Sequence, residues 1–337
     1  MTDILKKLIV LRMPGIGPAK FNGLVKKFDS LDAVIDVLNP DQEHIDNVKR
    51  EMDLANQHNI KYVSDDMKEY PDNLRVMKNH PPVICVRGNI DVLQQAIVAM
   101  VGTRHATAHG MEFMAKLAES FAGHNIAVVS GMAIGTDTAV HRGALRAGKT
   151  IAVLAGGADY IWPTENESLY WEIVERGAVV SEMPVGFVPV ANNFVMRNRI
   201  VAGLADKLIL GEADEKSGSM TTARFAIENN RTVYAVPSHP SDARAIGPNS
   251  LIKSGQAILC SGAQDFFQID KKSSVKKNFV GKNESENSIL DKLGFVPVSE
   301  SVLTEIVKKS ISEIKSELVI LEMQGLVRKI DGGYVRV

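Results

Sequence analysis

Short apolar runs recur along the middle of the chain and predict the strands of a buried, mostly parallel sheet. Helix-length segments separate most of them, for example residues 111–124. Strands that alternate with helices in this way specify a doubly wound α/β sheet. The seven runs cover residues 83–88, 96–102, 126–131, 150–156, 178–184, 207–213 and 232–238.

Different patterns flank this core on both sides. Short amphipathic helical patterns reach to about residue 78, which predicts a small helical domain over 1–78 before a core over 79–268. Residues 269–286 are rich in lysine and poor in apolar side chains, as in a solvated linker. A winged helix-turn-helix is expected over 287–337, from helical patterns at 289–294, 301–310 and 311–325 and a hairpin turning at Asp331, Gly332 and Gly333.

The segment MPGIGPAK, residues 13–20, places two glycines around one isoleucine between helical patterns. A helix-hairpin-helix turn has this pattern, and its backbone N–H groups can meet a phosphate. An ordinary connection between two helices explains the segment equally well, so both interpretations stay open.

The overall charge limits the kind of ligand that the chain can bind. There are 39 basic and 40 acidic residues, with a formal net charge of -1, so any anion binding must be local. Cys85 and Cys260 lie among apolar residues, which indicates buried thiols in a reducing compartment. No apolar stretch approaches the roughly 20 residues of a membrane helix. We expect a cytoplasmic protein without membrane contact.

Small residues follow four of the predicted strands. Ligands of open α/β sheets collect at the carboxyl ends of the strands. Gly, Ser and Thr at a helix N-terminus expose N–H donors that suit phosphate groups. The four segments, at residues 102–110, 130–137, 155–157 and 216–223, therefore predict a groove for a phosphate chain.

Two arginines in the segment FVMRNRIVAGL, residues 194–204, need a separate explanation. If a helix starts near Arg197, then Arg197 and Arg199 oppose its dipole by about 0.3–1 kcal/mol each. Residues two apart on a helix point in different directions. We therefore expect one arginine at the ligand groove and the other paired with a carboxylate such as Glu182 or Glu212.

A structural ion pair would explain either arginine by itself. For the two arginines together with Arg104 and Lys216, a phosphate-binding groove is the favoured interpretation.

Asp137 and His141 are four residues apart on a predicted helix and could share a face for acid–base or metal chemistry. A helix cap followed by a packed histidine explains them better. We expect no catalytic residue, no metal site and no cofactor.

Eight segments resemble, in order and spacing, the DprA/Smf family of bacterial DNA-processing proteins, and the match runs continuously over about residues 82–260. The flanking parts also look like the N-terminal and C-terminal modules of longer family members. The segments are VGTRHATAHG, VVSGMAIGTDTAVH, TIAVLAGGADYIWPTEN, SEMPVGFVP, FVMRNRIVAGLA, KSGSMTTARFA, VPS and GPNSLI.

The resemblance implies a Rossmann-like core and a recombination mediator without enzymatic turnover. Such a protein binds single-stranded DNA, and duplex DNA more weakly, forms a homodimer, and loads RecA onto strands covered by single-strand-binding protein during natural transformation or recombination. The dimer and RecA surfaces would lie near residues 223–230 and 251–260. The implied DNA contacts are Gly102, Thr103, Arg104, Ser130, Gly131, Phe194, Arg197, Asn198, Lys216, Ser217 and Gly218, to which the cation pattern adds Arg199.

Phe194 has two interpretations, as a residue that stacks on a base or as a core side chain. The sequence departs from the family pattern nearby, where Val195 replaces the usual proline and can alter the angle of Phe194. Trp162 replaces the usual tyrosine, Ser238 the usual glycine, and Gly211 the usual apolar residue.

Two other classes of function compete with the mediator. A nucleotide-processing phosphoribohydrolase-like enzyme can use the same core, but its PGGxGT motif is reduced here to residues 155–158, and Glu212 would be its acidic residue. A transcription regulator would read DNA through residues 311–325. That segment is acidic at Glu313, Glu317 and Glu322, so docking to a protein fits it better.

Overall fold

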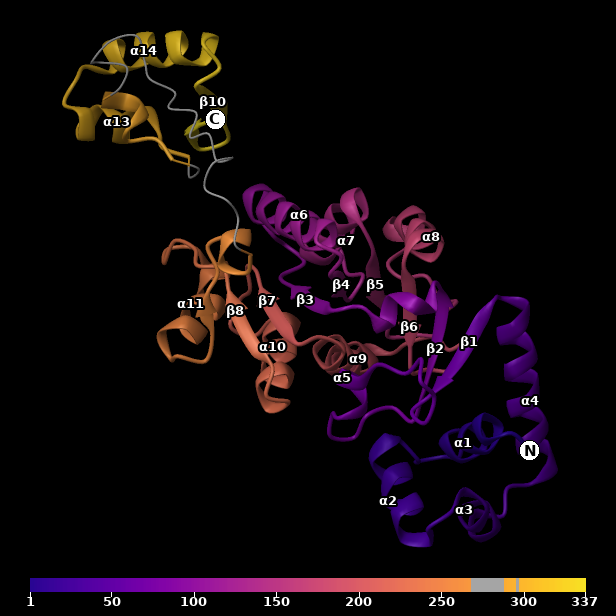
Figure 1. The fold of residues 1–337 in the computed structure, drawn as a ribbon. Helices are drawn as coiled ribbons and strands as arrows, with labels where there is room; N and C mark the ends of the chain where they lie inside the picture. Colours follow the sequence, from indigo (N-terminus) through magenta and orange to yellow (C-terminus); the bar gives the residue numbers. More distant parts are fainter. Residues whose placement is uncertain (268–287, 295–296) are drawn as a thin grey trace. The chain divides into compact units, whose positions relative to one another are not determined.

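The computed structural model describes residues 1–267, 288–294 and 297–337. The chain divides into two compact units, Met1–Gln268 and Ile269–Val337. The first unit contains a nine-stranded sheet with the order β1-β2-β6-β5-β4-β3-β7-β8-β9 (Figure 1). The predicted linker, residues 269–286, lies outside the described residues, and a domain boundary at residue 78 stays a prediction.

All seven predicted strands are present, most of them somewhat shorter than their apolar runs. Parallel pairing runs without interruption from β6 to β9. The predicted strands are β2 (Val83–Gly88), β3 (Ile97–Val101), β4 (Ala127–Ser130), β5 (Thr150–Val153), β6 (Ala178–Ser181), β7 (Lys207–Leu210) and β8 (Thr232–Ala235).

The pairing at the edges of the sheet differs from the prediction. Strand β2 is antiparallel to both of its neighbours, so the sheet is mostly parallel, as predicted, with an antiparallel edge. Strand β1 (Ile60–Ser64) pairs with β2, although its residues were placed among helical patterns. Strand β9 (Ile258–Leu259) has only two residues, too few to give a hydrophobic pattern.

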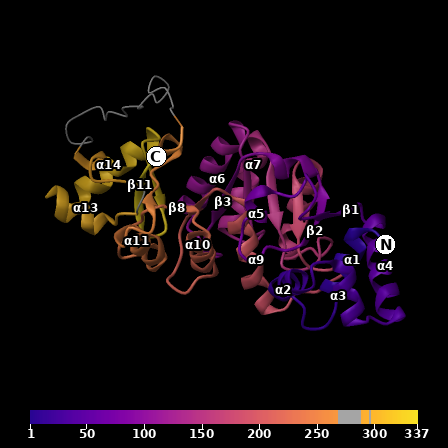
Figure 2. The ribbon, with the colours of Figure 1, turned by 60° about the horizontal axis from the view of Figure 1, so that its bottom comes forward.

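Helices cover both faces of the sheet (Figures 1 and 2). The side chains of β3 alternate between the faces, because Val98 and Met100 belong to one hydrophobic cluster and Ala99 and Val101 to another. Helices α6 (Ala108–Gly123), α7 (Thr136–Ala147) and α8 (Glu167–Arg176) cover one face; α5 (Asp72–Arg75), α9 (Ala191–Leu204) and α10 (Gly218–Glu228) cover the other, and α11 (Ile246–Lys253) follows β8.

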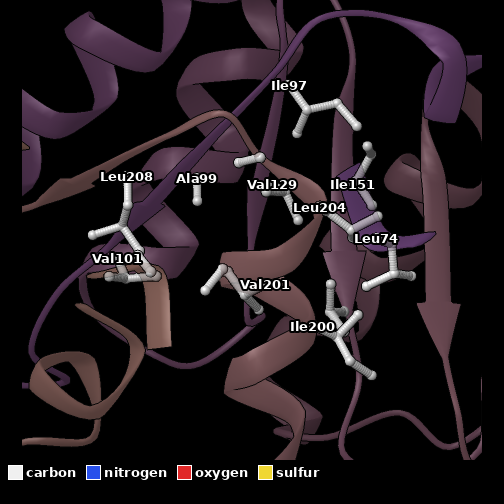
Figure 3. Close-up of a cluster of buried hydrophobic side chains, with 14 of the residues drawn as sticks. Leu74, Ile97, Ala99, Val101, Val129, Ile151, Ile200, Val201, Leu204 and Leu208 are labelled. Carbon is white, nitrogen blue, oxygen red and sulfur yellow. The ribbon is translucent and has the colours of Figure 1, made fainter. Parts of the chain in front are cut away.

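The apolar residues of α9 fix this helix across the centre of the sheet. Ile200, Val201 and Leu204 are buried against side chains of β3, β4 and β5, among them Val129 and Ile151 (Figure 3). Burying three such side chains contributes about 1.5–3 kcal/mol each. Because α9 lies across several strands, the polar residues that precede Ile200 are placed near the strand ends.

Four helices precede β1: α1 (Asp3–Leu11), α2 (Pro18–Phe28), α3 (Leu31–Leu38) and α4 (Gln42–Gln57). The MPGIGPAK segment forms the turn between α1 and α2. Gly15 has φ +72°, a left-handed conformation that favours glycine, and Ile16 is buried with Phe21 in a small core. This geometry fits both interpretations of the segment, which remain open.

The second unit has its own hydrophobic core, to which Leu303, Ile314 and Leu318 contribute. Ile330 pairs with Gly333, so the hairpin turns at Asp331 and Gly332, within the predicted turn. Its elements follow the order predicted for a winged helix-turn-helix: a helical stretch at 288–290, α13 (Glu300–Val307), α14 (Ile311–Met323), β10 (Val327–Ile330) and β11 (Gly333–Arg336).

None of the helices in the described residues combines the length and the apolar content that crossing a lipid bilayer requires.

Candidate nucleic-acid interface

Helix α9 begins earlier than the sequence pattern predicts. Its first residue is Ala191, and the side chain of Asn193 accepts a hydrogen bond from the backbone N–H of Val190 at 2.9 Å. Arg197 and Arg199 therefore lie in the middle of the helix, and the predicted opposition to its N-terminal dipole is wrong. Val190 is a poor N-cap residue by type, so the residues here contain little signal for a helix start.

The two arginines of α9 have different partners. Arg199 is buried, forms an ion pair with Glu182 and donates a hydrogen bond to the backbone oxygen of Asn79 at 3.1 Å. Burial raises the pKa of the Glu182 carboxyl group, and the charge of Arg199 opposes this shift. The expectation that one arginine pairs with Glu182 is confirmed, and that arginine is Arg199.

Arg197 is buried at the carboxyl ends of two strands. Its Nη1 donates hydrogen bonds to the backbone oxygens of Gly131, at 2.5 Å, and Val153. Burial lowers the pKa of Arg197 to about 10, Asp137 opposes this shift, and the charge of Arg104 adds to it. The guanidinium therefore stays protonated at neutral pH, and it lies close enough to a second cation to be affected by its charge.

Asn198 connects this position to the start of α10. Its side-chain oxygen accepts a hydrogen bond from Nε of Arg197 at 3.1 Å, and its Nδ2 donates to the backbone oxygen of Gly218 at 3.1 Å. The segment Lys216, Ser217 and Gly218 is thus held beside α9. Ser217 caps α10, because its Oγ accepts from the N–H of Met220 at 3.4 Å, while Lys216 is exposed.

A pocket lies beside Arg197. Phe194 lines it and is partly buried, so its ring borders the pocket rather than lying wholly inside the core. The ring centroids of Phe194 and Trp162 are 4.6 Å apart. The complete lining consists of Gly131, Leu154, Ala155, Gly156, Tyr160, Trp162, Pro189, Phe194 and Arg197.

Arg104 reaches the same region from the end of β3. Its guanidinium carbon is 5.6 Å from the ring centroid of Trp162, and the residue is exposed. Within residues 1–267, no carboxylate lies at ion-pair distance from Arg104 or Lys216. Arg104, Arg197 and the segment at Lys216 are therefore connected by contacts through Trp162, Phe194 and Asn198. Trp162 was not among the predicted site residues, and its only signal in the sequence was a departure from the family pattern.

Internal packing explains the glycines at the strand ends better than an approaching ligand does. A Cβ atom on Gly102 would lie 2.5 Å from Oγ1 of Thr136, and one on Gly131 would lie 2.9 Å from Cζ of Arg197. Gly218 differs, because the nearest atom to its Cβ position is Nδ2 of Asn198 at 3.7 Å. Only Gly218 of these three leaves ordinary space for a neighbouring group.

The N-terminus of α6 is already occupied by a carboxylate of the chain itself. Thr107 donates hydrogen bonds from its backbone N–H to Oε2 of Glu212 at 2.7 Å and from its hydroxyl to Oε1 at 2.5 Å. The N–H and hydroxyl of Thr107 at this helix start are therefore not free for a ligand. Glu212, the acidic residue of the rival enzyme hypothesis, is a capping residue in this geometry.

Ser130 and Thr103 contribute to the interior. Ser130 is fully buried and its hydroxyl donates to the backbone oxygen of Met100 at 2.7 Å. Thr103 is buried, and its hydroxyl oxygen accepts from the backbone N–H of His105 at 3.3 Å. Neither side chain is presented to an approaching ligand.

Asp137 and His141 do not form an acid–base pair. Asp137 lies at the start of α7, where Oδ2 accepts from the N–H of Ala133 at 3.3 Å, and burial raises its pKa. His141 is fully buried and its Nδ1 bonds to the hydroxyl of Thr150 at 2.7 Å, as predicted for a packed histidine. Burial, with a further contribution from Arg197, lowers the pKa of His141 to about 3. The described residues contain no cluster of His, Cys, Asp and Glu suited to a metal ion.

These features define a Rossmann-like α/β protein with an additional winged-helix unit. The family described as "DNA recombination-mediator protein A" matches residues 61–269, and the "DprA winged helix domain" matches residues 281–333. The chain therefore belongs to the DNA recombination-mediator protein A family, also called DprA/Smf, as the sequence motifs indicated.

Two curated relatives show how much of the chain this similarity covers. Protein Smf of Escherichia coli is 30% identical over 293 residues, which is 83% of this chain and 78% of that protein. Protein Smf of Synechocystis is 37% identical over 213 residues, or 62% of this chain, and the match spans only 54% of its own length.

Two solved structures are similar in fold. DNA processing protein A of Streptococcus pneumoniae has a TM-score of 0.68 and 29% identity, covering 79% of this chain and 96% of its own. DNA processing protein A of Helicobacter pylori, whose structure concerns its single-stranded DNA binding mode, has a TM-score of 0.56 and 31% identity. That match covers 61% of this chain and 94% of the Helicobacter pylori chain.

Proposed function

We propose that this chain is a recombination mediator that binds single-stranded DNA at the carboxyl ends of its parallel strands. The observation that carries the proposal is a set of three cations at neighbouring strand ends. Arg197 lines the pocket, Arg104 contacts Trp162 on the pocket wall, and Lys216 precedes the start of α10, which Asn198 joins to Arg197. Arg104 and Arg197 repel each other, and a phosphate near both would relieve that repulsion. The binding mode described for the Helicobacter pylori protein supports the same ligand for this chain.

The proposed surface is narrower than the set of residues that the sequence indicated. Arg199 is left out because Glu182 already neutralises it, and Ser130 because it is fully buried. Thr103 is left out because it is buried and its backbone N–H and oxygen are bonded to Glu212 and Thr136. The surface consists of Gly102, Arg104, Gly131, Phe194, Arg197, Asn198, Lys216, Ser217 and Gly218.

The proposal includes a homodimer that loads RecA onto strands covered by single-strand-binding protein during natural transformation or recombination. The edge strand β9 supports an interaction surface near residues 251–260, because Ile258 and Leu259 are exposed there. Binding and handover of a strand require no chemical step, so we propose a protein without enzymatic activity that works in the cytoplasm.

Charge-driven binding to single strands should depend steeply on salt and little on base sequence. We therefore expect Arg104→Ala and Lys216→Ala each to weaken binding of labelled oligonucleotides several-fold and to reduce the salt slope by about 0.7. Fluorescence anisotropy with single-stranded and duplex oligonucleotides over a salt series measures both quantities. Single strands should bind more tightly than duplexes.

Arg146→Ala is the matched control, because Arg146 is an exposed arginine of α7 paired with Glu119 and makes no contact with the pocket. It should bind single strands as the unmodified protein does. Unchanged affinity and salt slope in both Arg104→Ala and Lys216→Ala would refute the proposed surface.

A further inference from the structure

We infer that Asp137 is a positioning residue for strand binding, and that its carboxylate limits how tightly Arg197 holds a phosphate of the strand. The inference rests on the proposed function, because it names what sets the strength of one of the proposed phosphate contacts. Asp137 is not among the binding residues that the sequence motifs indicate.

The hydrogen bonds of Arg197 are the first argument. Nη1 donates to the backbone oxygens of Gly131 and Val153, and Nε donates to the side-chain oxygen of Asn198 at 3.1 Å. Among the residues that the structure describes, none accepts a hydrogen bond from Nη2. Because Arg197 lines the pocket, Nη2 is the nitrogen that remains for a phosphate there.

The position of the Asp137 carboxylate is the second argument. A Cβ atom on Gly131 would lie 2.9 Å from Nη2 of Arg197 and 2.9 Å from Oδ2 of Asp137, so those two atoms are at most twice that distance apart. In the described part of the chain, no ion pair or hydrogen bond joins the two side chains directly. The carboxylate therefore lies beside Nη2 and leaves its hydrogens to another acceptor.

Burial makes the charge of Asp137 effective at this distance. Only 7% of Asp137 and 7% of Arg197 is exposed, so water screens their interaction weakly. Oδ2 of Asp137 also accepts a hydrogen bond from the backbone N–H of Ala133 at 3.3 Å, which holds the carboxylate at the start of α7. Burial lowers the pKa of Arg197, and the charge of Asp137 opposes this shift.

A phosphate that accepts a hydrogen bond from Nη2 must come close to this carboxylate. Two anions beside one guanidinium repel each other, so Asp137 weakens the attraction between Arg197 and the phosphate. The contact is weaker than an arginine without a neighbouring carboxylate would make. A mediator has to release the strand that it passes on, and Asp137 makes this release easier.

Neutralising Asp137 should therefore strengthen binding. The side chain of Asp137→Asn has nearly the same shape, and its amide oxygen can still accept from the N–H of Ala133. We expect the full-length variant to bind labelled oligo-dT about ten-fold more tightly than the unmodified protein at low salt, mainly through slower release. Its salt slope should be steeper by about 0.7. Anisotropy over a salt series measures affinity and slope, and a chase with unlabelled oligo-dT measures release.

Asp91→Asn is the matched control, because it removes the same charge from an exposed position outside the pocket lining. It should bind oligo-dT as the unmodified protein does. An equal gain in Asp91→Asn and Asp137→Asn would show that net charge alone strengthens binding, and would overturn the inference.

A double substitution tests whether Asp137 acts through Arg197. In an Arg197→Gln background the pocket lacks this cation, so the addition of Asp137→Asn should change the oligo-dT affinity by less than about two-fold. A gain as large as that in the unmodified background would show that the carboxylate acts independently of Arg197, against the inference.

A carboxylate with a structural role alone predicts the opposite result, because its loss can only loosen Arg197. Unchanged or weaker oligo-dT binding by Asp137→Asn, in a protein whose circular dichroism spectrum shows it folded, would overturn the inference and leave the proposed function standing. Asp137→Ser, a smaller neutral substitution, repeats the test if Asp137→Asn does not fold. Failure of both variants to fold would assign the charge to stability alone and would also overturn the inference. If oligo-dT does not bind the unmodified protein at all, the proposed function fails as well.

Discussion

The environment of Arg197 and Arg199 shows how two identical side chains on one helix acquire different roles. Backbone oxygens of Gly131 and Val153 hold the guanidinium of Arg197, and these groups carry no net charge. Arg199 instead has the carboxylate of Glu182. The positive charge of Arg199 is thus paired directly with a carboxylate, whereas Arg197 has Asp137 within electrostatic range but makes its hydrogen bonds to neutral groups and lines the pocket.

His141 is a buried titratable residue beside this site. Its pKa falls from the ordinary value of 6.5 to about 3 in the folded protein. Below pH 6.5 the unfolded chain therefore binds a proton that the folded chain does not. Above pH 6.5 this difference has no effect on the free energy of unfolding. As the pH falls from 6.5 toward 3, the free energy of unfolding decreases by up to about 1.4 kcal/mol per pH unit.

Replacing His141 should remove this dependence. We expect the free energy of unfolding of His141→Asn to decrease less between pH 6.5 and pH 4.5 than that of the unmodified protein. Guanidinium denaturation at a series of pH values measures the two slopes. His239→Asn, at an exposed position, should keep the original slope. Equal slopes in His141→Asn and the unmodified protein would contradict the assignment.

At the level of single elements, the sequence predicted the central strands well because each is an apolar run buried on both faces. It missed β9, which has two residues, and placed the start of α9 six residues too late, because Val190 gives no capping signal. Apolar periodicity reports burial, so it identifies interior elements and says little about edges and helix starts.

The sequence predicted only part of the candidate site, again because periodicity does not report every feature of the fold. The motifs placed Arg104, Arg197 and Lys216 at strand ends, but the contacts between those ends depend on strand order, which periodicity does not determine. Trp162 follows β5 and Arg104 follows β3, and their contact joins loops from two different strands. The hydrogen bonds from Thr107 to Glu212 depend in the same way on β3 and β7 being neighbours.

The contact between Glu212 and the start of α6 yields a prediction about this element. Glu212→Ala removes the acceptors of the Thr107 N–H and hydroxyl and takes a negative charge from a helix N-terminus. We expect a loss of about 1–2 kcal/mol in the free energy of unfolding. Guanidinium denaturation at neutral pH measures it. Glu215→Ala, in the neighbouring exposed loop, serves as the control and should change stability little. A Glu212→Ala protein as stable as this control would show that the cap contributes nothing.

At the scale of the whole molecule, the charge is nearly balanced and the proposed function depends on where a few cations lie. All residues of the proposed surface belong to the first unit, Met1–Gln268. The second unit has its own core, and its helix α14 exposes the apolar side chains of Val319, Ile320 and Met323 beside the acidic Glu322. Such a surface is unsuited to a phosphate backbone and better suited to a protein.

The division of roles predicts that the first unit binds single-stranded DNA by itself. A chain that ends at residue 267 should bind oligo-dT with the same affinity, within about three-fold, and with the same salt slope as the full chain, because it keeps every proposed phosphate contact. Anisotropy measurements on both proteins make the comparison. Arg104→Ala in the shortened chain should lose the same factor as in the full chain. If removal of residues 268–337 instead lowers the salt slope by more than the Arg104→Ala substitution does, then cations of the second unit contact the strand, and the assignment of binding to the strand ends alone is wrong.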